Sequence, residues 1–399
     1  MPDVAIGPVT CAGCGLLCDD VRLDLSGEAV RLQPACDLGA RWFTERVRRA
    51  DDAPAATIEG EPAEVKAALV RAAALLRGSR RPLIYGFEQS TVEGARAAVA
   101  LADRLGALVM TDTPGDPWPG APALPLRGVT TATLGEIRDR SRVVVIWRED
   151  PETTHPRLLE RLGFGAGSPA QRTLVVIDDR DTPTAARATL RLQWPRERDL
   201  AALVSLHALQ RDRPPAPSDL DAQLATLMEH VRDVPHVAVV HGSGLGAGDG
   251  GQRRALALHE LTRALSHERH VVTMALPRAA GITGAQDVLA WQTGYAGSVD
   301  LAGGHPELVV STHPADGVDL ALRIEGAAAP LPAHVAEISL GHGPDADAGV
   351  WIRTAAPGVE AEGTAHRLDG VPLALQAPRA GEAPTAAAVL TRLLTEVGL

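Results

Sequence analysis

Four cysteines lie close together near the start of the 399-residue chain, and they are its only thiols. Cys11, Cys14 and Cys18 have the spacing C-x2-C-x3-C, and Cys36 follows after a separate turn. Short spacings with one more distant cysteine are typical of a [4Fe–4S] cluster, because four thiolates must reach four iron corners. The spacing therefore predicts a cluster with these four cysteines as its metal ligands.

Three other interpretations of the cysteines remain open. Two disulfides are typical of small secreted domains, whereas this chain is long and is expected to lack a secretory signal. A zinc site of four thiolates commonly contains two C-x2-C pairs, and the second pair is missing here. A metal-free remnant of a cluster site is the third alternative.

The charge of the chain argues against two classes of partner. Its formal net charge is -11 at pH 7, whereas binding to nucleic acid or to an anionic membrane needs a basic face. The sequence contains no run of 18 apolar residues, and no basic-then-apolar leader opens it. We therefore expect a cytoplasmic protein with neither nucleic acid nor membrane as partner.

Strand and helix patterns alternate from residue 56 onwards. Pro82–Gly86 and Leu108–Met110 are predicted as buried strands on either side of a helix over Ser90–Leu105. Strand, helix and strand at this spacing form a βαβ unit, which builds a parallel sheet. The alternation continues over residues 142–274, and further strands, a hairpin over 359–375 and a helix over 385–397 follow. The patterns predict an α/β protein with a small strand-rich unit around the cysteines.

Two sets of residues are candidates for binding an anionic cofactor. Gly244, Gly246 and Gly248 follow the predicted strand His236–Val240, and Gly246, Gly248 and Gly251 match G-x-G-x-x-G before a predicted helix. Backbone amides at such a helix start favour phosphate, although a flexible turn is the alternative. Arg278 follows the predicted strand Val271–Met274, where it can pair with a carboxylate or phosphate or form a surface salt bridge.

No catalytic residue is assigned from the residues alone. The sequence has no Ser/His/Asp order, no H-E-x-x-H and no Walker loop. His155 lies after the predicted strand 142–147, where open α/β sheets bind ligands, and it is either a base or a loop anchor. Glu360, His366 and Arg367 belong to a hairpin whose default interpretation is a solvated surface.

Five stretches spread over nearly the whole chain carry a family resemblance. They are Cys11–Asp20 with Cys36, Thr131–Ile137 leading into Val143–Arg157, Val176–Thr182, Thr283–Tyr295 and Val359–Gly370. Together they resemble the B subunit of formylmethanofuran dehydrogenase, with Trp291–Tyr295 and Glu360–Thr364 as specific stretches. The resemblance implies a molybdopterin-oxidoreductase fold: a small strand-rich iron–sulfur domain plus two nested parallel-sheet α/β domains, which hold a molybdenum or tungsten bis-pterin.

The resemblance also implies domain boundaries. Residues 1–55 with 356–375 are expected to form the cysteine domain, because the hairpin 359–371 is implied to return and pack on it. Residues 56–120 with 305–355 and 376–399 form one α/β domain. Residues 121–304 form the second.

The sequence departs from the redox-active members of this family at two places. Those members carry a metal-binding cysteine or selenocysteine in N-T-x-x-x-C-H-G, whereas Asp112–Pro119 contains neither thiol nor histidine. The family stretch R-G-H-Y-N-V-T-G is shortened to Arg278–Gly284, which keeps the arginine as a remnant and loses the histidine. A site without its soft ligand and its proton carrier should not oxidise formate.

The resemblance and its departures together predict a redox-silent B subunit of a formyltransferase/hydrolase complex in one-carbon metabolism. The expected partners are a formyltransferase, an amidohydrolase-like formyl hydrolase and a third (C) subunit. We expect the [4Fe–4S] cluster to be kept and the molybdopterin or tungstopterin to be lost. One alternative is an active dehydrogenase that interconverts formate and carbon dioxide with Asp112 or Asp116 as metal ligand. Another is a stand-alone iron–sulfur electron carrier.

Overall fold

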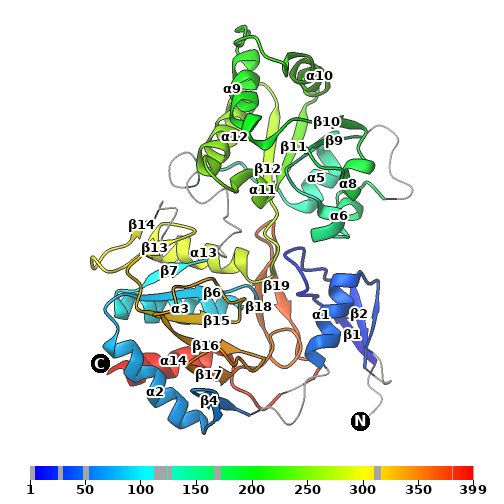
Figure 1. The fold of residues 1–399 in the computed structure, drawn as a ribbon. Helices are drawn as coiled ribbons and strands as arrows, with labels where there is room; N and C mark the ends of the chain where they lie inside the picture. Colours follow the sequence, from blue (N-terminus) through cyan, green and yellow to red (C-terminus); the bar gives the residue numbers. More distant parts are fainter. Residues whose placement is uncertain are drawn as a thin grey trace. The chain divides into compact units, whose positions relative to one another are not determined.

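The computed structural model describes residues 5–25, 30–47, 54–111, 124, 128–165, 172–309, 316–379 and 381–398. The chain divides into two compact units, of which the first comprises residues 1–114 and 279–399 and the second residues 115–278. Each unit contains a large sheet with parallel strands and helices (Figure 1). This confirms the predicted α/β class with parallel sheets, and the finer division into three domains stays a prediction.

The first unit is built on a nine-stranded sheet with the order β14-β13-β7-β6-β15-β16-β17-β4-β5. Its five central strands run parallel and are mostly buried, as expected for strands covered on both faces. They are β7 (Leu108–Met110), β6 (Pro82–Gly86), β15 (Leu320–Ile324), β16 (Ala336–Gly341) and β17 (Val350–Arg353). Antiparallel strands close both edges: β13 (Val299–Asp300), β14 (Glu307–Leu308), β4 (Ala56–Ile58) and β5 (Glu61–Pro62).

Four helices share one apolar core with this sheet. They are α2 (Val65–Gly78), α3 (Val92–Leu105), α13 (Ile282–Thr293) and α14 (Ala386–Gly398). Apart from Phe87, the buried core residues are Ala, Val, Leu and Ile, in keeping with the 3% aromatic content of the chain. Helix α3 is capped by Thr91, whose side chain accepts a hydrogen bond from the Gly94 amide, so the helix starts at Val92, two residues after the predicted Ser90. Helix α13 was not predicted.

The second unit has five parallel strands in the order β10-β9-β8-β11-β12. They are β8 (Val143–Trp147), β9 (Thr173–Ile177), β10 (Leu190–Leu192), β11 (His236–His241) and β12 (His270–Ala275). Numbered within the unit, the order is 3-2-1-4-5, that of doubly wound dinucleotide-binding folds. The order reverses between β8 and β11, so the carboxyl ends of these two strands mark the expected ligand crevice.

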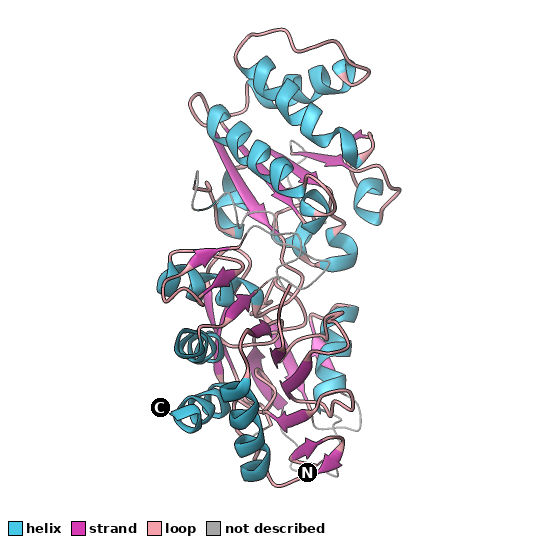
Figure 2. Ribbon diagram, turned by 60° about the vertical axis from the view of Figure 1, so that its left-hand side comes forward, coloured by secondary structure: helices cyan, strands magenta, loops and turns pink. Residues whose placement is uncertain are grey.

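Helices alternate with these strands in the second unit (Figure 2). They are α5 (Leu134–Arg140), α6 (Pro151–Thr154), α7 (Leu158–Arg161), α8 (Pro183–Ala186), a 3-10 turn (Arg196–Arg198), α9 (Asp199–Gln210), α10 (Asp221–Arg232), α11 (Ser243–Gly246) and α12 (Gly251–Leu265). Of these, α6 to α12 lie within residues 142–274, where alternating strands and helices were predicted. Among the helices of the described residues, none combines the length and the apolar character needed to cross a bilayer.

A three-stranded antiparallel sheet carries the N-terminal segment of the first unit. It consists of β1 (Ala5–Val9), β2 (Val21–Asp24) and β3 (Arg31–Gln33), and helix α1 (Asp37–Val47) follows. The helix was not predicted, although Trp42 and Phe43 bury one of its faces. The hairpin predicted near the C-terminus is confirmed as β18 (Gly363–His366) and β19 (Pro372–Leu375).

Candidate functional sites

The four cysteines are held by two stretches of backbone, 11–18 and 36–39, which we call the cysteine segment. The first stretch is a closed loop, in which the Cys11 amide donates to the Cys18 carbonyl at 2.8 Å and the Leu17 amide to the Cys14 carbonyl at 3.2 Å. The second is the start of α1. Cys11, Cys14 and Cys18 are buried and Cys36 is partly buried, and none of the four is part of a disulfide.

Two glycines bring these stretches into contact. A side chain on Gly13 would lie 3.1 Å from the Cα atom of Gly39, so the two backbones touch. A side chain on Gly39 would lie 3.0 Å from the Cys11 sulfur and 3.7 Å from the Cys36 sulfur. The sulfurs from the two stretches therefore face the same point of the α1 backbone.

The C-terminal hairpin closes over the cysteine segment. The Leu368 amide donates to the Gly15 carbonyl at 3.0 Å. Thr10 donates through its backbone amide to Gln376 and through its hydroxyl to the Ala374 carbonyl, both at 2.8 Å. The contact between hairpin and cysteine loop that the resemblance implied is therefore present.

The environment of the thiols disfavours negative charge. Burial raises the pKa of the Cys14 thiol to about 12, and charge on Cys18, Cys11 and Cys36 adds to the effect. Four thiolates can therefore coexist here only with a cation between them, since bound metal favours the deprotonated form.

The second unit has a cavity of about 820 Å³ at the strand-order reversal, which we call the switch-point cavity. Its walls come from the residues after β8, β9 and β11 and include the predicted Gly244 and Arg278. Four arginines and five carboxylates line it: Arg148, Arg180, Arg196 and Arg278 with Glu149, Asp150, Asp178, Asp179 and Glu197. The lining is therefore not a net cationic surface of the kind that attracts phosphates.

The arginine after β8 is neutralised by its own chain. Arg148 is buried, and its guanidinium donates to both carboxylate oxygens of Asp199 at 2.9 Å and to the Trp194 carbonyl at 2.7 Å. Its remaining nitrogen lies 3.1 Å from Asp179. Bidentate pairing of this kind fixes the side chain and leaves little positive charge for a ligand.

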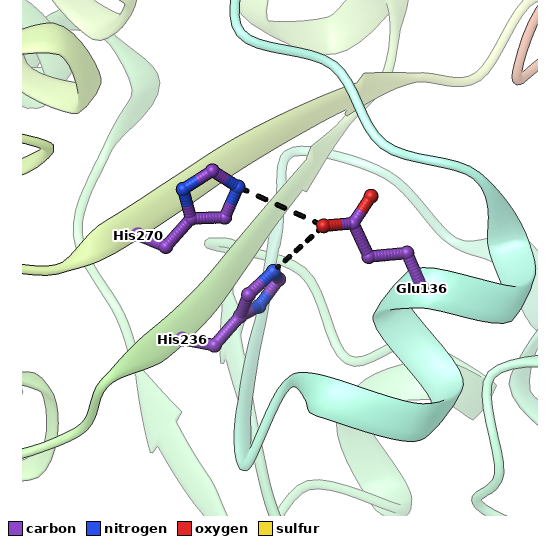
Figure 3. A group of neighbouring side chains, drawn as sticks. All are labelled: Glu136, His236 and His270. Carbon is purple, nitrogen blue, oxygen red and sulfur yellow. Dashed lines mark hydrogen bonds and ion pairs between the residues drawn. The ribbon is translucent and has the colours of Figure 1, made fainter.

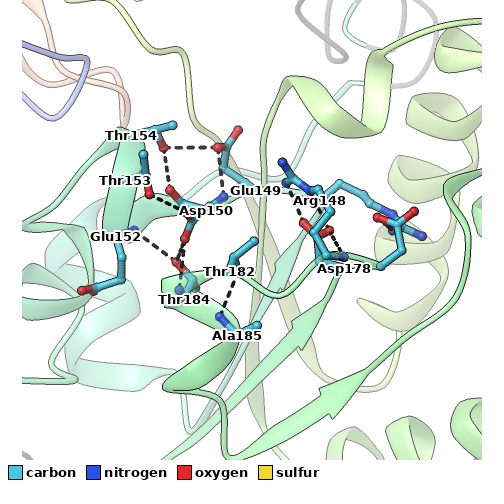
Figure 4. Close-up of polar contacts among 12 residues, drawn as sticks. Arg148, Glu149, Asp150, Glu152, Thr153, Thr154, Asp178, Thr182, Thr184 and Ala185 are labelled. Carbon is cyan, nitrogen blue, oxygen red and sulfur yellow. Dashed lines mark hydrogen bonds and ion pairs between the residues drawn. The ribbon is translucent and has the colours of Figure 1, made fainter.

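The carboxylates of the cavity wall hold the loops around it (Figure 4). Asp150 accepts hydrogen bonds from the Thr184 amide at 3.0 Å and from the Thr184 and Thr153 hydroxyls. Asp178 is buried and accepts from the Arg180 guanidinium at 2.9 and 3.0 Å. Burial alone would raise the pKa of Asp178, but the hydrogen bonds from Arg180 lower it overall. These groups therefore serve mainly to position the walls.

The glycine-rich stretch after β11 is packed against its own unit. A side chain on Gly242 would overlap the Glu149 carboxylate at 1.7 Å, and one on Gly244 would lie 2.4 Å from the Arg148 carbonyl. Arg254 donates to the carbonyls of Leu245 at 2.8 Å and Asp249 at 2.9 Å, and also to that of Ala247. The guanidinium thus fills the interior of the loop that contains Gly246 and Gly248.

Two further candidates from the sequence have defined positions. His155 is fully buried, with one ring nitrogen 3.0 Å from the Thr154 hydroxyl and the other 3.0 Å from the Pro277 carbonyl, as expected for a loop anchor. Arg278 is exposed on the cavity wall. Asp112, Asp116 and Trp118 lie outside the described residues.

Glu360 and His366 are buried, contrary to the default interpretation of a solvated surface. Glu360 is 8% exposed and accepts hydrogen bonds from the Ala356 amide at 3.0 Å and from Arg353 at 3.1 Å, with His342 3.1 Å away. Burial opposes its ionisation, yet these partners lower the pKa of Glu360 to about 2. His366, also buried, lies 2.6 Å from Asp287.

Sequence reasoning missed Glu325, which follows the buried strand β15. It lies on a cavity of about 630 Å³ in the first unit, together with Glu93 and Glu362 and without a basic residue among the described lining residues. Burial raises the pKa of Glu325 to about 8, against a hydrogen bond from Thr354 that lowers it. An acid directly after the run Leu320–Ile324, at the carboxyl end of a parallel strand, was the signal that could have found it.

The chain is similar to proteins of one-carbon metabolism. The B subunit of tungsten-containing formylmethanofuran dehydrogenase 2 is 28% identical in Methanocaldococcus jannaschii and 25% identical in Methanococcus maripaludis, with 92% of each chain covered in both cases. No protein-family model matches the chain.

Two solved structures share its fold. A chain of the formyltransferase/hydrolase complex from Methylorubrum extorquens, crystallised with methylofuran, superposes with a TM-score of 0.68 and 25% identity, over 86% of this chain and 98% of that one. Acetylene hydratase from Pelobacter acetylenicus superposes with a TM-score of 0.54 and 13% identity, over 98% and 69%, and shows likeness of fold alone. The resemblance to the B subunits of formylmethanofuran dehydrogenases, which the sequence motifs predicted, is thus confirmed over nearly the whole chain.

Proposed function

We propose that this chain is a redox-silent B subunit that scaffolds a cytoplasmic formyltransferase/hydrolase complex in methanofuran- and tetrahydromethanopterin-linked one-carbon metabolism. Its partners in this proposal are a formyltransferase, an amidohydrolase-like formyl hydrolase and a third (C) subunit. The observation that carries the proposal is the confinement of all four cysteines to residues 11–36. In the redox-active relatives, a cysteine or selenocysteine in the stretch that corresponds to residues 112–119 binds the redox metal. This chain has no cysteine there, so such a metal would lack its thiolate ligand.

The similar sequences and the similar solved structure both support this proposal. The relatives from methanogens are named as tungsten-containing dehydrogenase subunits, whereas the solved structure that this chain covers to 98% is part of a formyltransferase/hydrolase complex. Both point to one-carbon metabolism. The lost cysteine and histidine at 112–119 and 278–284 favour the hydrolytic complex over the dehydrogenase.

The residues around the switch-point cavity do not fit a molybdenum or tungsten bis-pterin. Such a cofactor is anionic, and five carboxylates outnumber the four arginines of the lining. Arg148 is committed to Asp199, and Arg254 occupies the glycine-rich loop where a phosphate would bind. We therefore derive no reaction step through this cofactor.

The cysteine segment does fit a [4Fe–4S] cluster. Its four thiols come from two facing stretches and are mostly buried. The C-x2-C-x3-C spacing with the distant Cys36 favours a cluster over zinc. Such a cluster would stabilise the small domain of residues 1–55 and 356–375.

The family resemblance also extends to the other domains of the proposal. Residues 56–120 with 305–355 and 376–399, and residues 121–304, form the two nested α/β domains of molybdopterin-oxidoreductase type. In a redox-silent protein of this type, these domains present surfaces to the partner proteins. In this interpretation, Arg278 is the arginine that remains from the family's R-G-H-Y-N-V-T-G stretch.

The second candidate function is that of an active dehydrogenase, which interconverts formate and carbon dioxide. The tungsten-containing relatives favour it. It requires a metal ligand other than sulfur, for which Asp112 and Asp116 are the candidates from the sequence.

Anaerobic purification of the complex, followed by metal counting, separates the two functions. We expect about four irons per chain, visible absorption from thiolate-bound iron, no stoichiometric tungsten or molybdenum, and no dye-linked formate oxidation. Cys14→Ser should remove the iron and the absorption. Stoichiometric tungsten or molybdenum with formate oxidation would establish the dehydrogenase, and bound zinc in place of iron would overturn the cluster assignment.

A further inference from the structure

A second group of potential metal ligands lies at the amino-terminal edge of the sheet in the second unit. It consists of Glu136, His236 and His270, whose donor atoms all lie within 4.8 Å of one another (Figure 3). The switch-point cavity is at the carboxyl ends of the same strands. The group is therefore separate from the candidate sites described above.

Three elements fix the positions of these side chains. His236 begins β11 and His270 begins β12, and the two residues are paired in the parallel register, so their rings lie side by side with centroids 4.9 Å apart. Glu136 is in the first turn of α5, where its amide donates to the capping Thr133 hydroxyl at 3.2 Å. The carboxylate thus extends from the helix toward both rings.

The distances suit a metal ion better than a direct ion pair. The His236 Nε2 atom lies 3.4 Å and the His270 Nε2 atom 3.7 Å from the same Glu136 oxygen. Both exceed the usual N–H···O distance. Ligands about 2.0–2.1 Å from a tetrahedral zinc ion are about 3.3 Å apart, which is close to the spacing observed.

A neighbouring hydroxyl orients the buried ring. The Nδ1 atom of His236 lies 2.8 Å from the Ser141 hydroxyl, and with Nδ1 as donor the Nε2 lone pair points at the group. Such an outer partner is typical of metal-binding histidines.

We propose that Glu136, His236 and His270 bind one zinc(II) ion. Two imidazoles and one carboxylate form a ligand set used for this metal, and a fourth position is left for water. His270 is 54% exposed, so solvent can reach that side. Arg140, 3.8 Å from Glu136 and exposed, is the cation that the metal would replace. The ion ties the starts of β11 and β12 to α5.

The test is zinc binding to the whole chain, measured by equilibrium dialysis and metal analysis. His270→Ala removes an exposed ligand, and His267→Ala removes an exposed histidine outside the group. We expect the His270→Ala protein to hold one zinc equivalent less than wild type, or to bind it at least tenfold more weakly, with His267→Ala unchanged. Equal stoichiometry and affinity in wild type and His270→Ala would overturn the proposal.

Cobalt(II) keeps the result distinct from metal bound to the cysteines. Thiolate-bound cobalt gives sulfur-to-metal charge-transfer absorption, which a site of histidine and carboxylate lacks. We expect the His270→Ala protein to bind one cobalt equivalent less than wild type, with the charge-transfer absorption unchanged. We expect the Glu136→Gln protein to lose the same equivalent. Loss of the charge-transfer band in His270→Ala would mean that the metal lies at the cysteines and would contradict the assignment.

Discussion

The cysteine segment of the first unit and the switch-point cavity of the second differ in what their polar groups face. In the cysteine segment, sulfurs from two stretches face a common point beside Gly39. In the cavity, Arg148 pairs with Asp199, Asp178 with Arg180, and Arg254 with loop carbonyls. The charged groups of the cavity are therefore held by one another, whereas the sulfurs of the cysteine segment are gathered at one point.

This difference matches the proposed loss of one cofactor and retention of another. A cluster needs only the four thiols, and the chain keeps all of them. An anionic cofactor at the cavity needs cations that remain available, and here Arg148 and Arg180 are paired with carboxylates of the same unit. Each side of the comparison can be tested by substitution.

The largest effect is expected from breaking the buried ion pair of the cavity. Asp199→Ala leaves the Arg148 guanidinium and the Trp194 ring N–H, both buried, without their main acceptor. Loss of one partner of a buried pair costs about 3–5 kcal/mol. Urea unfolding measures it, and Asp219→Asn, which disrupts an exposed pair with Arg198, is the control at about 0–1 kcal/mol. Equal small losses would show that Arg148 is not held by Asp199.

A second prediction concerns two buried rings beside the cavity. Burial lowers the pKa of His241 to about 3 and that of His259 to about 4, and the rings contact each other edge to face. Because the unfolded rings bind protons near pH 6.5, stability is complete above that pH and is lost as the pH falls toward 4. The loss is on the order of 3 kcal/mol for His259.

The measurement is the urea midpoint at pH 7 and pH 5 in wild type, His259→Leu and the exposed control His267→Leu. The wild type and the control should lose stability over this interval. His259→Leu should lose clearly less. An unchanged slope in His259→Leu would show that the ring is protonated in the folded protein.

A third prediction tests the closeness of the sulfurs to α1. Gly39→Ala places a methyl group 3.0 Å from the Cys11 sulfur, and overpacking of this kind costs about 1–3 kcal/mol. We expect at least half of the iron to be lost on purification. Gly135→Ala is the matched helical control, since its nearest neighbour is 3.9 Å away. Full iron content in Gly39→Ala would place the cluster elsewhere.

The last prediction concerns Glu325, where the expected effect depends on pH. Its raised pKa means that the folded protein holds the proton more tightly than the unfolded chain between about pH 4.5 and pH 8. Stability is therefore complete below pH 4.5 and falls as the pH rises through 8. Glu325→Gln should raise the urea midpoint at pH 8 and leave it nearly unchanged at pH 4.5. A lower midpoint at pH 8 would mean that the ionised carboxylate is favoured.

The sequence predicts the fold better than it predicts the sites. A continuous apolar run such as Val143–Trp147 identifies a buried parallel strand, because strands covered on both faces need no polar alternation. Helix α13 was missed since its residues, such as Gly284, Gln286 and Asp287, weaken the apolar period. Its burial depends on tertiary packing against α3.

The sites were harder to predict because their ligands come from distant parts of the chain. Glu136, His236 and His270 are separated by about a hundred and then thirty-four residues, and only the sheet register brings them together. The glycine-rich loop has the spacing of a phosphate site, yet Arg254, outside that motif, determines what fills it. Only the cysteines are close enough in sequence for spacing alone to predict a common ligand.

Arg254 also has a consequence for how the second unit resists cleavage. Six glycines between residues 242 and 251 would ordinarily make an easy target for proteases. The Arg254 guanidinium donates hydrogen bonds to three carbonyls of this stretch. These bonds must break before the backbone can enter the active site of a protease in an extended conformation. We therefore expect residues 242–251 to be among the last parts of the second unit that a protease cleaves.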